Sequence, residues 1–380
     1  MSRTLSFLLF LAIALSLVAG MHYYVWARLV RDPQLPQGWA RVGTGALVAL
    51  AIALPLALWL SRVAPGVRPL LWLAFVWMGV GFLLVAFLGI ADAGRLAAWA
   101  VRRLGGPETP ADPQKRVLLA RTVAAGVGGV VAGLSAFGVR SALGAVDVKA
   151  LTVRLRGLPQ TLAGFKLVQI SDVHVGPLLR KEWLRGVVAQ ISSLAPDAVV
   201  ITGDLVDGSV AELREHVEPL GELKPPRGVF FSTGNHEYYS GVAQWMAHLP
   251  TLGIQPLSNR HVELAPGLDL AGIDDPSGEP DLALALEGRD GRKPVILLAH
   301  QPRQFAEAVR REVDLTLSGH THGGQIWPFS WVVALTQPYL AGLHVRGGSQ
   351  LYVSRGTGFW GPPLRVFAPA EITLLTLQPA

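Results

Sequence analysis

The chain has 380 residues, of which 51% are hydrophobic, a mean hydropathy of +0.39 and a net charge of +6. Residues 1–150 carry 14 Lys/Arg against 5 Asp/Glu, a balance of +9, whereas residues 151–380 carry 19 against 22, a balance of −3. The basic pI of about 9.8 therefore belongs to the first half of the chain, and the slightly acidic second half removes the support for nucleic-acid binding that such a pI would otherwise give.

Four long stretches nearly free of charge precede residue 140, at residues 5–26, 42–60, 70–90 and 122–139. Each has roughly the 17–25 residues that a helix needs to cross a bilayer. Buried core helices of a soluble protein are the alternative, but four such stretches in succession favour membrane spans. The first stretch could also be a signal peptide, although no small-residue cleavage site stands out after it. We expect an all-α transmembrane domain of about four helices over residues 1–140.

The basic residues that flank these stretches predict the orientation of the chain. The connections after the first and third stretches hold nine Lys/Arg, whereas the opposite face would hold five. The positive-inside rule then places the large C-terminal half outside the cytoplasm. The sequence thus predicts a multi-pass protein of the inner membrane, with the bilayer as its partner and an oligomeric state that the sequence leaves open.

After Lys149 the pattern changes to short β-rich runs that alternate with amphipathic helical stretches. This alternation predicts a linker and first strand over residues 141–160 and a layered α/β domain over residues 161–380. The expected strands are residues 165–171, 197–202, 228–233, 294–300 and 314–319. The expected helices are residues 181–194, 210–220, 242–249 and 303–312.

Polar side chains follow every one of the expected strands. In chain order they are Asp172 and His174, Asp204 and Asp207, Asn235 and His236, His300, and finally His320 and His322. Because ligands of open α/β sheets bind beyond the carboxyl ends of the strands, we expect these side chains to meet at one edge of one sheet. Each motif alone is better explained by a turn or a hydrogen-bonded core histidine than by a site. Five of the ten histidines together, however, need a charge to organise them.

The chemistry of these side chains indicates a metal centre. Mixed imidazole and carboxylate ligands, with no thiolate available, suit Mn, Fe, Zn or a similar first-row ion rather than Ca. The set is larger than one tetrahedral shell, so two metal ions are expected rather than one. The glycines that precede two of the polar residues, Gly203 and Gly234, are expected to keep the backbone clear of a bound phosphate.

The series DVH, GD, GNHE, H and GHTH, with YVSRGTG further on, resembles the calcineurin-like metallophosphoesterases, which are binuclear-metal hydrolases of phosphate esters. The resemblance covers about residues 165–325 and implies a four-layer αββα catalytic domain. It also implies the ligands: Asp172, His174 and His322 on one metal, Asn235, His300 and His320 on the other, and Asp204 bridging both. Asp207 lies outside this pattern and is interpreted as a turn or supporting residue.

The same resemblance implies a mechanism. Two cations activate a bridging water, which attacks the phosphorus as hydroxide, and His236 stabilises the transition state or protonates the leaving alkoxide. The expected reaction is hydrolysis of a phosphomonoester, phosphodiester or pyrophosphate, with a diester preferred.

The membrane half favours a lipid-linked or envelope substrate. Four aromatic residues near the site could form an apolar entrance for an acyl chain, belong to the core, or rest on the bilayer: Trp327, Phe329, Phe359 and Trp360. The family includes enzymes that cleave the pyrophosphate of UDP-diacylglucosamine, an activity that requires the catalytic domain on the cytoplasmic side. A non-catalytic sensor or transporter is the second alternative. Spans almost free of internal charge and a complete ligand set weigh against it.

Overall fold

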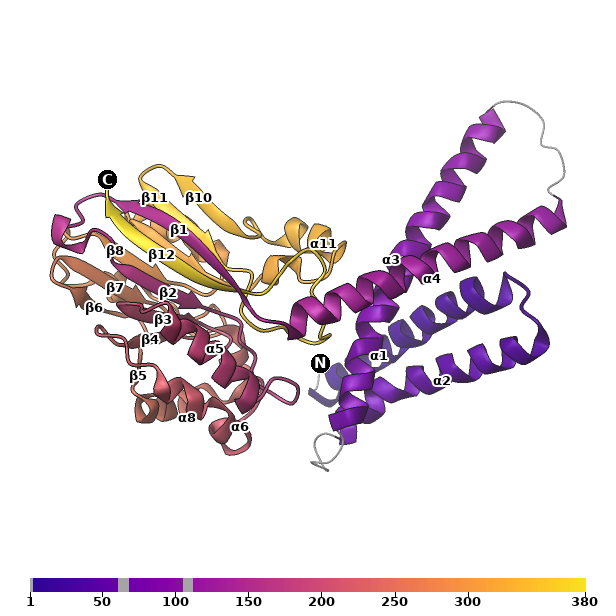
Figure 1. Ribbon diagram of the computed structural model, residues 1–380, viewed down its shortest axis with the longest axis horizontal. Coiled ribbons are helices and arrows are strands. Elements are labelled where there is room, and N and C mark those ends of the chain that lie inside the picture. Colours follow the sequence, from indigo (N-terminus) through magenta and orange to yellow (C-terminus); the bar gives the residue numbers. More distant parts are fainter. Residues whose placement is uncertain (1–2, 61–67, 105–111) are drawn as a thin grey trace. The chain divides into compact units, whose positions relative to one another are not determined.

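The computed structural model describes residues 3–60, 68–104 and 112–380 of the chain. The chain divides into two compact units, Met1–Gly138 and Val139–Ala380. Figure 1 shows the first unit as helices alone and the second as strands with shorter helices.

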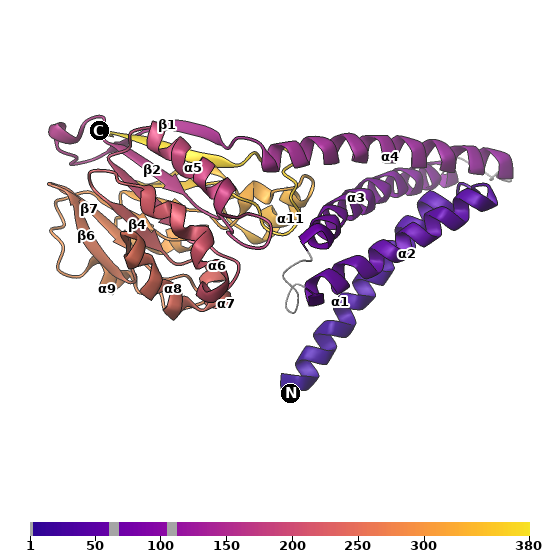
Figure 2. The ribbon, with the colours of Figure 1, turned by 60° about the horizontal axis from the view of Figure 1, so that its bottom comes forward.

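The first unit consists of four long helices, seen in Figures 1 and 2. They are α1 (Arg3–Trp26), α2 (Gln37–Leu60), α3 (Arg68–Leu104) and α4 (Pro113–Leu143). Each includes a segment long and apolar enough to cross a membrane, where a helix satisfies every backbone polar group within itself. A π-helical turn, η1 (Ala27–Arg31), continues α1. The predicted all-α domain of four long apolar helices is confirmed, although α3 continues well beyond its apolar run.

Polar side chains join the helices of the first unit. The indole nitrogen of Trp77 in α3 donates a hydrogen bond to His22 in α1 over 2.9 Å. The indole nitrogen of Trp26 likewise donates to the hydroxyl of Thr44 in α2 over 2.9 Å. In an apolar surrounding an unpaired polar group is unfavourable, so such bonds fix which faces of neighbouring helices meet.

Two six-stranded sheets form the centre of the second unit. The first has the strand order β1-β12-β2-β3-β4-β5. Its strands are β1 (Asp147–Leu155), β2 (Lys166–Ile170), β3 (Ala198–Thr202), β4 (Val229–Ser232), β5 (Ile254–Pro256) and β12 (Glu371–Pro379). Strands β2 to β5 run parallel, and β12 lies antiparallel to β2 and parallel to β1.

The second sheet has the order β10-β11-β9-β8-β7-β6. Its strands are β6 (Arg260–Ala265), β7 (Leu268–Gly272), β8 (Val295–Leu298), β9 (Leu315–Ser318), β10 (Gly342–Arg346) and β11 (Ser349–Val353). Strands β7, β8, β9 and β11 run parallel, and antiparallel hairpins close both edges.

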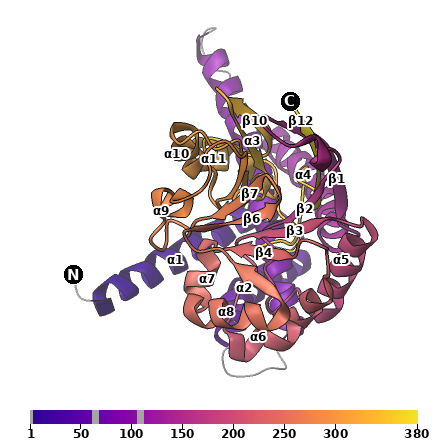
Figure 3. The same ribbon diagram turned by 90° about the vertical axis from the view of Figure 1, so that its left-hand side faces the viewer.

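Helices cover the outer faces of the two sheets, as Figure 3 shows. On the first sheet lie α5 (Lys181–Ser193), α6 (Val210–Val217) and α8 (Val242–His248), and on the second lie α9 (Leu282–Leu286) and α10 (Phe305–Arg310). Alternation along each strand builds this sandwich: Leu167 belongs to the core between the sheets, and its neighbour Val168 to the core beneath the helices. The predicted αββα domain is confirmed.

The five predicted strands correspond to β2, β3, β4, β8 and β9, but the prediction that they share one sheet is wrong. Strands β2, β3 and β4 belong to the first sheet, and β8 and β9 to the second. Short apolar runs are buried on both faces whether a strand lies in a sandwich or in a single sheet covered on both sides, so the pattern does not distinguish the two.

Candidate metal centre

The loops after the five strands bring all seven predicted metal ligands together. Asp172 and His174 follow β2, Asp204 follows β3, Asn235 begins α7 (Asn235–Ser240) after β4, His300 follows β8, and His320 and His322 follow β9. Five of them have a left-handed backbone: Asp172 (φ 51°), His174 (51°), Asp204 (52°), His320 (71°) and His322 (52°). Such conformations are unfavourable for residues other than glycine and concentrate where function requires them.

The first cluster consists of Asp172, His174 and His322. The Nε2 atoms of the two histidines lie 3.1 Å apart, and Nε2 of His322 lies 3.4 Å from Oδ1 of Asp172. All three side chains are buried, and their ligand atoms lie within 4.8 Å of one another. Two ring nitrogens and a carboxylate oxygen directed at one small space form a suitable donor set for a cation.

The second cluster consists of Asp204, His300 and His320 and meets the same distance limit. Nδ1 of His300 lies 2.9 Å from the carbonyl oxygen of Thr202, which can only accept, so this nitrogen carries the proton. The other nitrogen, Nε2, is buried and has no hydrogen-bond partner among the described residues, while Oδ2 of Asp204 lies 3.1 Å away. Asn235 completes the cluster, with its Oδ1 3.1 Å from Nδ1 of His320. These residues fit a bound cation.

Asp204 connects the two clusters. Its Oδ2 lies 3.1 Å from Nε2 of His300 in the second cluster and 3.9 Å from Nε2 of His174 in the first. Its other oxygen accepts a hydrogen bond from the backbone of His236 over 2.9 Å. One carboxylate oxygen thus faces donor atoms of both clusters, as a ligand shared by two ions must.

Burial and neighbouring charges shift the pKa values of His300, His174 and Asp204 in opposite directions. Burial lowers the pKa of His300, but the facing Asp204 carboxylate outweighs it and raises the pKa to about 10. At His174 burial also lowers the pKa, but Asp207 and Asp204 raise it to about 9. Burial alone would raise the pKa of Asp204, yet His300 holds it well below its usual range. Positive charge is therefore most favourable in the space between the imidazoles and the carboxylate.

Burial is the main cause of the pKa shifts of three other predicted ligands, His320, His322 and Asp172. Burial, together with the neighbouring His300, lowers the pKa of His320 to about 3. Burial and the charge on His174 lower the pKa of His322 as well, and burial raises the pKa of the Asp172 carboxyl. Both of these histidines are therefore neutral near pH 7, which is the form that coordinates a metal.

Asp207, which the motif leaves outside the ligand set, accepts from two histidines. Its Oδ1 lies 3.1 Å from Nδ1 of His174 and 2.5 Å from Nδ1 of His236. Burial raises the pKa of this carboxyl, but His174 and His236 outweigh it and hold the pKa well below its usual range. The carboxylate therefore fixes the proton of each histidine on Nδ1 and leaves Nε2 directed into the site.

Two further residues, for which the motifs predict no role, support the predicted ligands. The buried carboxylate of Glu237 accepts backbone N–H bonds from Asp204 (3.0 Å), Leu205 (2.8 Å) and Gly234 (2.7 Å), which ties the loop after β3 to the loop after β4. The motif GNHE contains this residue, so a signal was present. Arg365 is fully buried and lies 3.4 Å from Nδ1 of His322, and nothing in its sequence context marks it.

The sequence predicts that Gly203 and Gly234 keep the backbone clear of a bound phosphate, but in the structure their missing side chains serve loop packing. A Cβ atom on Gly203 would lie 2.7 Å from the backbone of Gly234 and 2.7 Å from Nδ1 of His300. A Cβ on Gly234 would lie 2.2 Å from Oδ1 of Asp204. The missing side chains therefore let the loops carrying Asp204, Asn235 and His300 pack against one another.

Exposed aromatic side chains flank His236. The ring of Tyr239 lies 5.4 Å and that of Trp360 lies 5.7 Å from the imidazole, both edge-on, and these side chains are 74% and 55% exposed. Phe359, by contrast, is buried in the core. His236 is therefore the partly exposed member of the site and lies next to two exposed aromatic rings.

Comparison with known proteins agrees with this geometry. Residues 165–324 match the family described as calcineurin-like phosphoesterase. A transmembrane protein with metallophosphoesterase domain from Danio rerio is 34% identical over 384 residues, covering 94% of this chain and 86% of that protein. An uncharacterized metallophosphoesterase from Helicobacter pylori is 44% identical over 222 residues, covering 56% and 60%. A solved dimetal phosphatase from Danio rerio has a TM-score of 0.34 at 15% identity, covering 51% of this chain and 88% of that chain.

The chain belongs to the calcineurin-like metallophosphoesterases, a family of metal-dependent phosphoester hydrolases. Its relatives include transmembrane proteins from Danio rerio and Bos taurus, the second 37% identical over 81% of this chain and 73% of that protein. With four apolar helices in its first half, it is a membrane protein. The family implies divalent metal ions, and the two clusters that Asp204 joins could hold them.

Replacing Glu237 with Gln is expected to lower the thermal unfolding midpoint of the full-length protein. Gln keeps the size of the side chain but turns one acceptor oxygen into an NH2 group facing a backbone N–H. A buried donor left unpaired costs about 1–3 kcal/mol. Glu215→Gln, at an exposed position of α6, is the matched control and should leave the midpoint unchanged. Equal midpoints for Glu237→Gln and the unsubstituted protein would contradict this role.

Proposed function

We propose that the protein is a membrane-anchored hydrolase with two metal ions that cleaves a phosphate ester of a lipid-linked or envelope substrate. The observation that carries the proposal is the position of Asp204, whose Oδ2 faces donor atoms of both clusters. A single-metal site needs no such shared oxygen. Cleavage of a phosphomonoester, phosphodiester or pyrophosphate bond is compatible with this centre.

Each proposed ion has its own ligands besides Asp204. Asp172, His174 and His322 would hold the first ion, and Asn235, His300 and His320 would hold the second. Nitrogen and oxygen ligands without sulfur favour Mn, Fe or Zn. When bound, the two ions would supply Lewis-acid polarisation of the phosphate and a water whose pKa is lowered to near neutrality.

His236 is the proposed proton donor to the leaving group. Asp207 binds its Nδ1 at 2.5 Å, so Nε2 is the nitrogen free to face substrate. Its side chain is 15% exposed, whereas the metal-facing His174 and His300 are buried. Partial exposure suits a group that must contact an incoming substrate and exchange its proton with solvent between turnovers.

A diester substrate is favoured over a monoester by the surroundings of His236. Tyr239 and Trp360 present exposed rings beside the proposed proton donor. Such rings contact an organic substituent on the leaving oxygen, and a diester still carries a second substituent on the phosphate. Apolar surface of this kind also fits an amphiphilic substrate better than a small hydrophilic one.

The helix α11 (Phe329–Thr336) supports a substrate located at the membrane. It contains no charged residue, and three of its side chains are strongly exposed: Trp331 (61%), Val332 (51%) and Leu335 (86%). The helix packs directly on the ligand loop, because a Cβ on Gly324 would lie 2.4 Å from the backbone of Ser330. We infer that this apolar surface contacts lipid, either the bilayer surface or the acyl part of the substrate.

The catalytic domain is proposed to face the non-cytoplasmic side of the inner membrane. Nine Lys/Arg lie between the first and second and between the third and fourth apolar stretches, several of them inside the ends of the helices, against five on the opposite face. The positive-inside rule favours the more basic face on the cytoplasmic side. With this orientation the substrate belongs to the envelope, and hydrolysis of a cytoplasmic UDP-linked lipid is not the proposed reaction.

Paired variants of the centre should separate metal binding from proton transfer. Asp204→Asn is expected to lose both ions because it removes the shared carboxylate charge. His236→Ala is expected to keep both ions and to lose about 10²–10⁴-fold in kcat on a chromogenic phosphodiester. Elemental analysis and steady-state rates of the full-length protein measure the two effects. Two ions retained in Asp204→Asn, or unchanged turnover in His236→Ala, would refute the assignment.

Substitutions in α11 test the lipid contact. The double variant Trp331→Ser and Leu335→Ser is expected to lower kcat/KM on a chromogenic phosphodiester lipid embedded in vesicles. The rate on a water-soluble diester should not change, since neither side chain belongs to the metal centre. Leu284→Ser, an exposed apolar position of α9, is the control. A parallel loss on both substrates would show that the helix only supports the fold.

A reporter joined after Ala380 tests the orientation. A fluorescent protein that matures only in the cytoplasm is expected to stay dark at this position, and a periplasmically active phosphatase to be active. The same reporters joined after Arg103 should give the opposite result, because the chain has crossed the membrane once less. Fluorescence from the C-terminal fusion would overturn the proposed orientation and return the cytoplasmic pyrophosphate substrate to consideration.

A further inference from the structure

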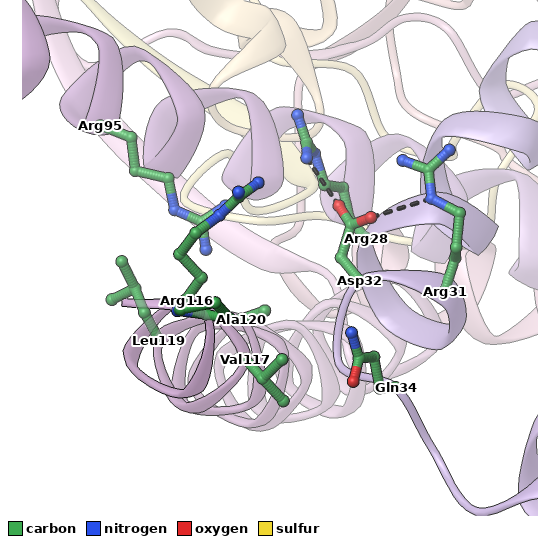
Figure 4. A pocket seen from close by; sticks show the side chains of 10 residues that line it. Arg28, Arg31, Asp32, Gln34, Arg95, Arg116, Val117, Leu119 and Ala120 are labelled. Atoms are coloured by element: carbon green, nitrogen blue, oxygen red, sulfur yellow. Dashed lines mark hydrogen bonds and ion pairs between the residues drawn. The ribbon is translucent and has the colours of Figure 1, made fainter. Parts of the chain in front are cut away.

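The first unit contains a cavity of about 510 Å³ at the ends of its helices. Figure 4 shows Arg95 and Arg116 pointing into it from one side and Arg28, Arg31 and Asp32 from the other. Its other lining residues are Gln34, Pro113, Val117, Leu119 and Ala120. Arginine side chains from three different segments thus meet in one cavity with an apolar wall.

The π-helical turn η1 produces the right-hand group in Figure 4. The backbone N–H of Asp32 bonds to the carbonyl of Ala27, five residues back, at 2.9 Å, which is the wider π-helical spacing. Turns of this kind are uncommon and occur often at functional sites. Here the turn brings Arg28 and Arg31 to the two oxygens of Asp32, at 2.7 and 2.9 Å.

Positive charge in the cavity exceeds negative charge. Arg28 also pairs with Asp92 of α3 at 2.9 Å, and Arg95 pairs with the same carboxylate at 3.3 Å. Three guanidinium groups thus share two carboxylates, and with Arg116 the four arginines exceed the two carboxylates by two positive charges. Arg116 makes no ion pair within the part of the chain that the structure describes. Nε of Arg95 is buried and has no hydrogen-bond partner among residues 3–60, 68–104 and 112–380.

The positive-inside rule explains why basic residues occur at these helix ends, but it does not explain why their side chains are ordered around a cavity. Arginines that only set topology are free in solvent or at the lipid surface. In this protein, carboxylates position Arg28, Arg31 and Arg95 around a cavity, and Arg121 holds the adjoining turn by donating to the carbonyl of Pro33 over 2.9 Å. An organised set of guanidinium groups with excess charge is complementary to a phosphate, which accepts paired N–H bonds from arginine.

We propose that this cavity binds the phosphate group of an anionic lipid. The wall of Val117, Leu119 and Ala120 on α4 supplies apolar contact beside the guanidinium groups, as an amphiphile requires. Four membrane crossings place the α1–α2 and α3–α4 connections on one face of the bilayer and the chain after α4 on the other. The cavity is therefore a second phosphate site, built from residues of the first unit alone, and it does not depend on the proposed catalysis.

Arg116→Gln in the full-length protein is the primary test. Thermal unfolding in neutral detergent is followed with added phosphatidylglycerol, phosphatidylcholine or inorganic phosphate. Phosphatidylglycerol is expected to stabilise the unsubstituted protein, and Arg116→Gln to raise its apparent Kd by about tenfold or more, the effect of one lost charge-assisted hydrogen bond. Arg116→Lys, which keeps the charge but not the paired donors, should lie between the two. Because the metal centre is the same in all three proteins, differences between them report on the cavity alone.

Arg102→Gln is the matched control, since it removes a positive charge from an exposed position near the end of α3, outside the cavity. It should respond to phosphatidylglycerol as the unsubstituted protein does. Equal losses in Arg102→Gln and Arg116→Gln would reduce the effect to general attraction between a basic surface and anionic lipid, and would overturn the proposal. An unchanged response in Arg116→Gln would overturn it as well. Stabilisation by inorganic phosphate that Arg116→Gln abolishes, without one by the lipid, would assign the site to free phosphate and refute the lipid.

Discussion

A buried carboxylate that faces several imidazoles governs the arrangement of the second unit. Asp204 lies between His300 on one side and His174 on the other. Burial of its negatively charged carboxylate would be strongly unfavourable without positive charge nearby. The two sheets must therefore keep their relative positions, because Asp204 follows β3 of the first sheet and His300 follows β8 of the second. Glu237 fixes the backbone of Asp204, and Gly203 and Gly234 allow the loops to meet closely enough. The two packed sheets thus position Oδ2 of Asp204 between the imidazole nitrogens of His174 and His300.

Much of this site could be predicted because its ligands follow strands, and strands can be recognised as short apolar runs. The seven ligand positions come together in space, and four of the predicted helices, at residues 181–194, 210–220, 242–249 and 303–312, correspond to α5, α6, α8 and α10. Which sheet a strand joins could not be predicted, because pairing depends on partners distant in sequence. The bonds of Asp207 to His174 and His236 likewise depend on how two loops meet. Arg365, 43 residues after His322, carries no motif at all.

Less of the first unit could be predicted, because the sequence indicates its helices mainly by the length of their apolar stretches. Composition indicates where four helices cross, but not that α1 ends in a π-helical turn, or that Arg28 reaches Asp92, 64 residues away. Counted along the chain, the arginines there set orientation; in the structure they are also ordered around a cavity. The two proposed phosphate sites thus differ in chemistry, since the one in the second unit would use metal ligands and the one in the first unit guanidinium groups.

Only three residues, Gly144 to Val146, join the end of α4 to β1, the outermost strand of the first sheet. Fully extended, such a link spans roughly 10–14 Å at 3.3–3.6 Å per residue. A catalytic domain on so short a link cannot search the aqueous compartment. It meets targets that share its bilayer by lateral diffusion, so collisions depend on the number of molecules per unit area rather than per unit volume. For the proposed lipid-linked substrate, crowding of the membrane and dilution by other lipids would then control the rate of hydrolysis more directly than any bulk concentration.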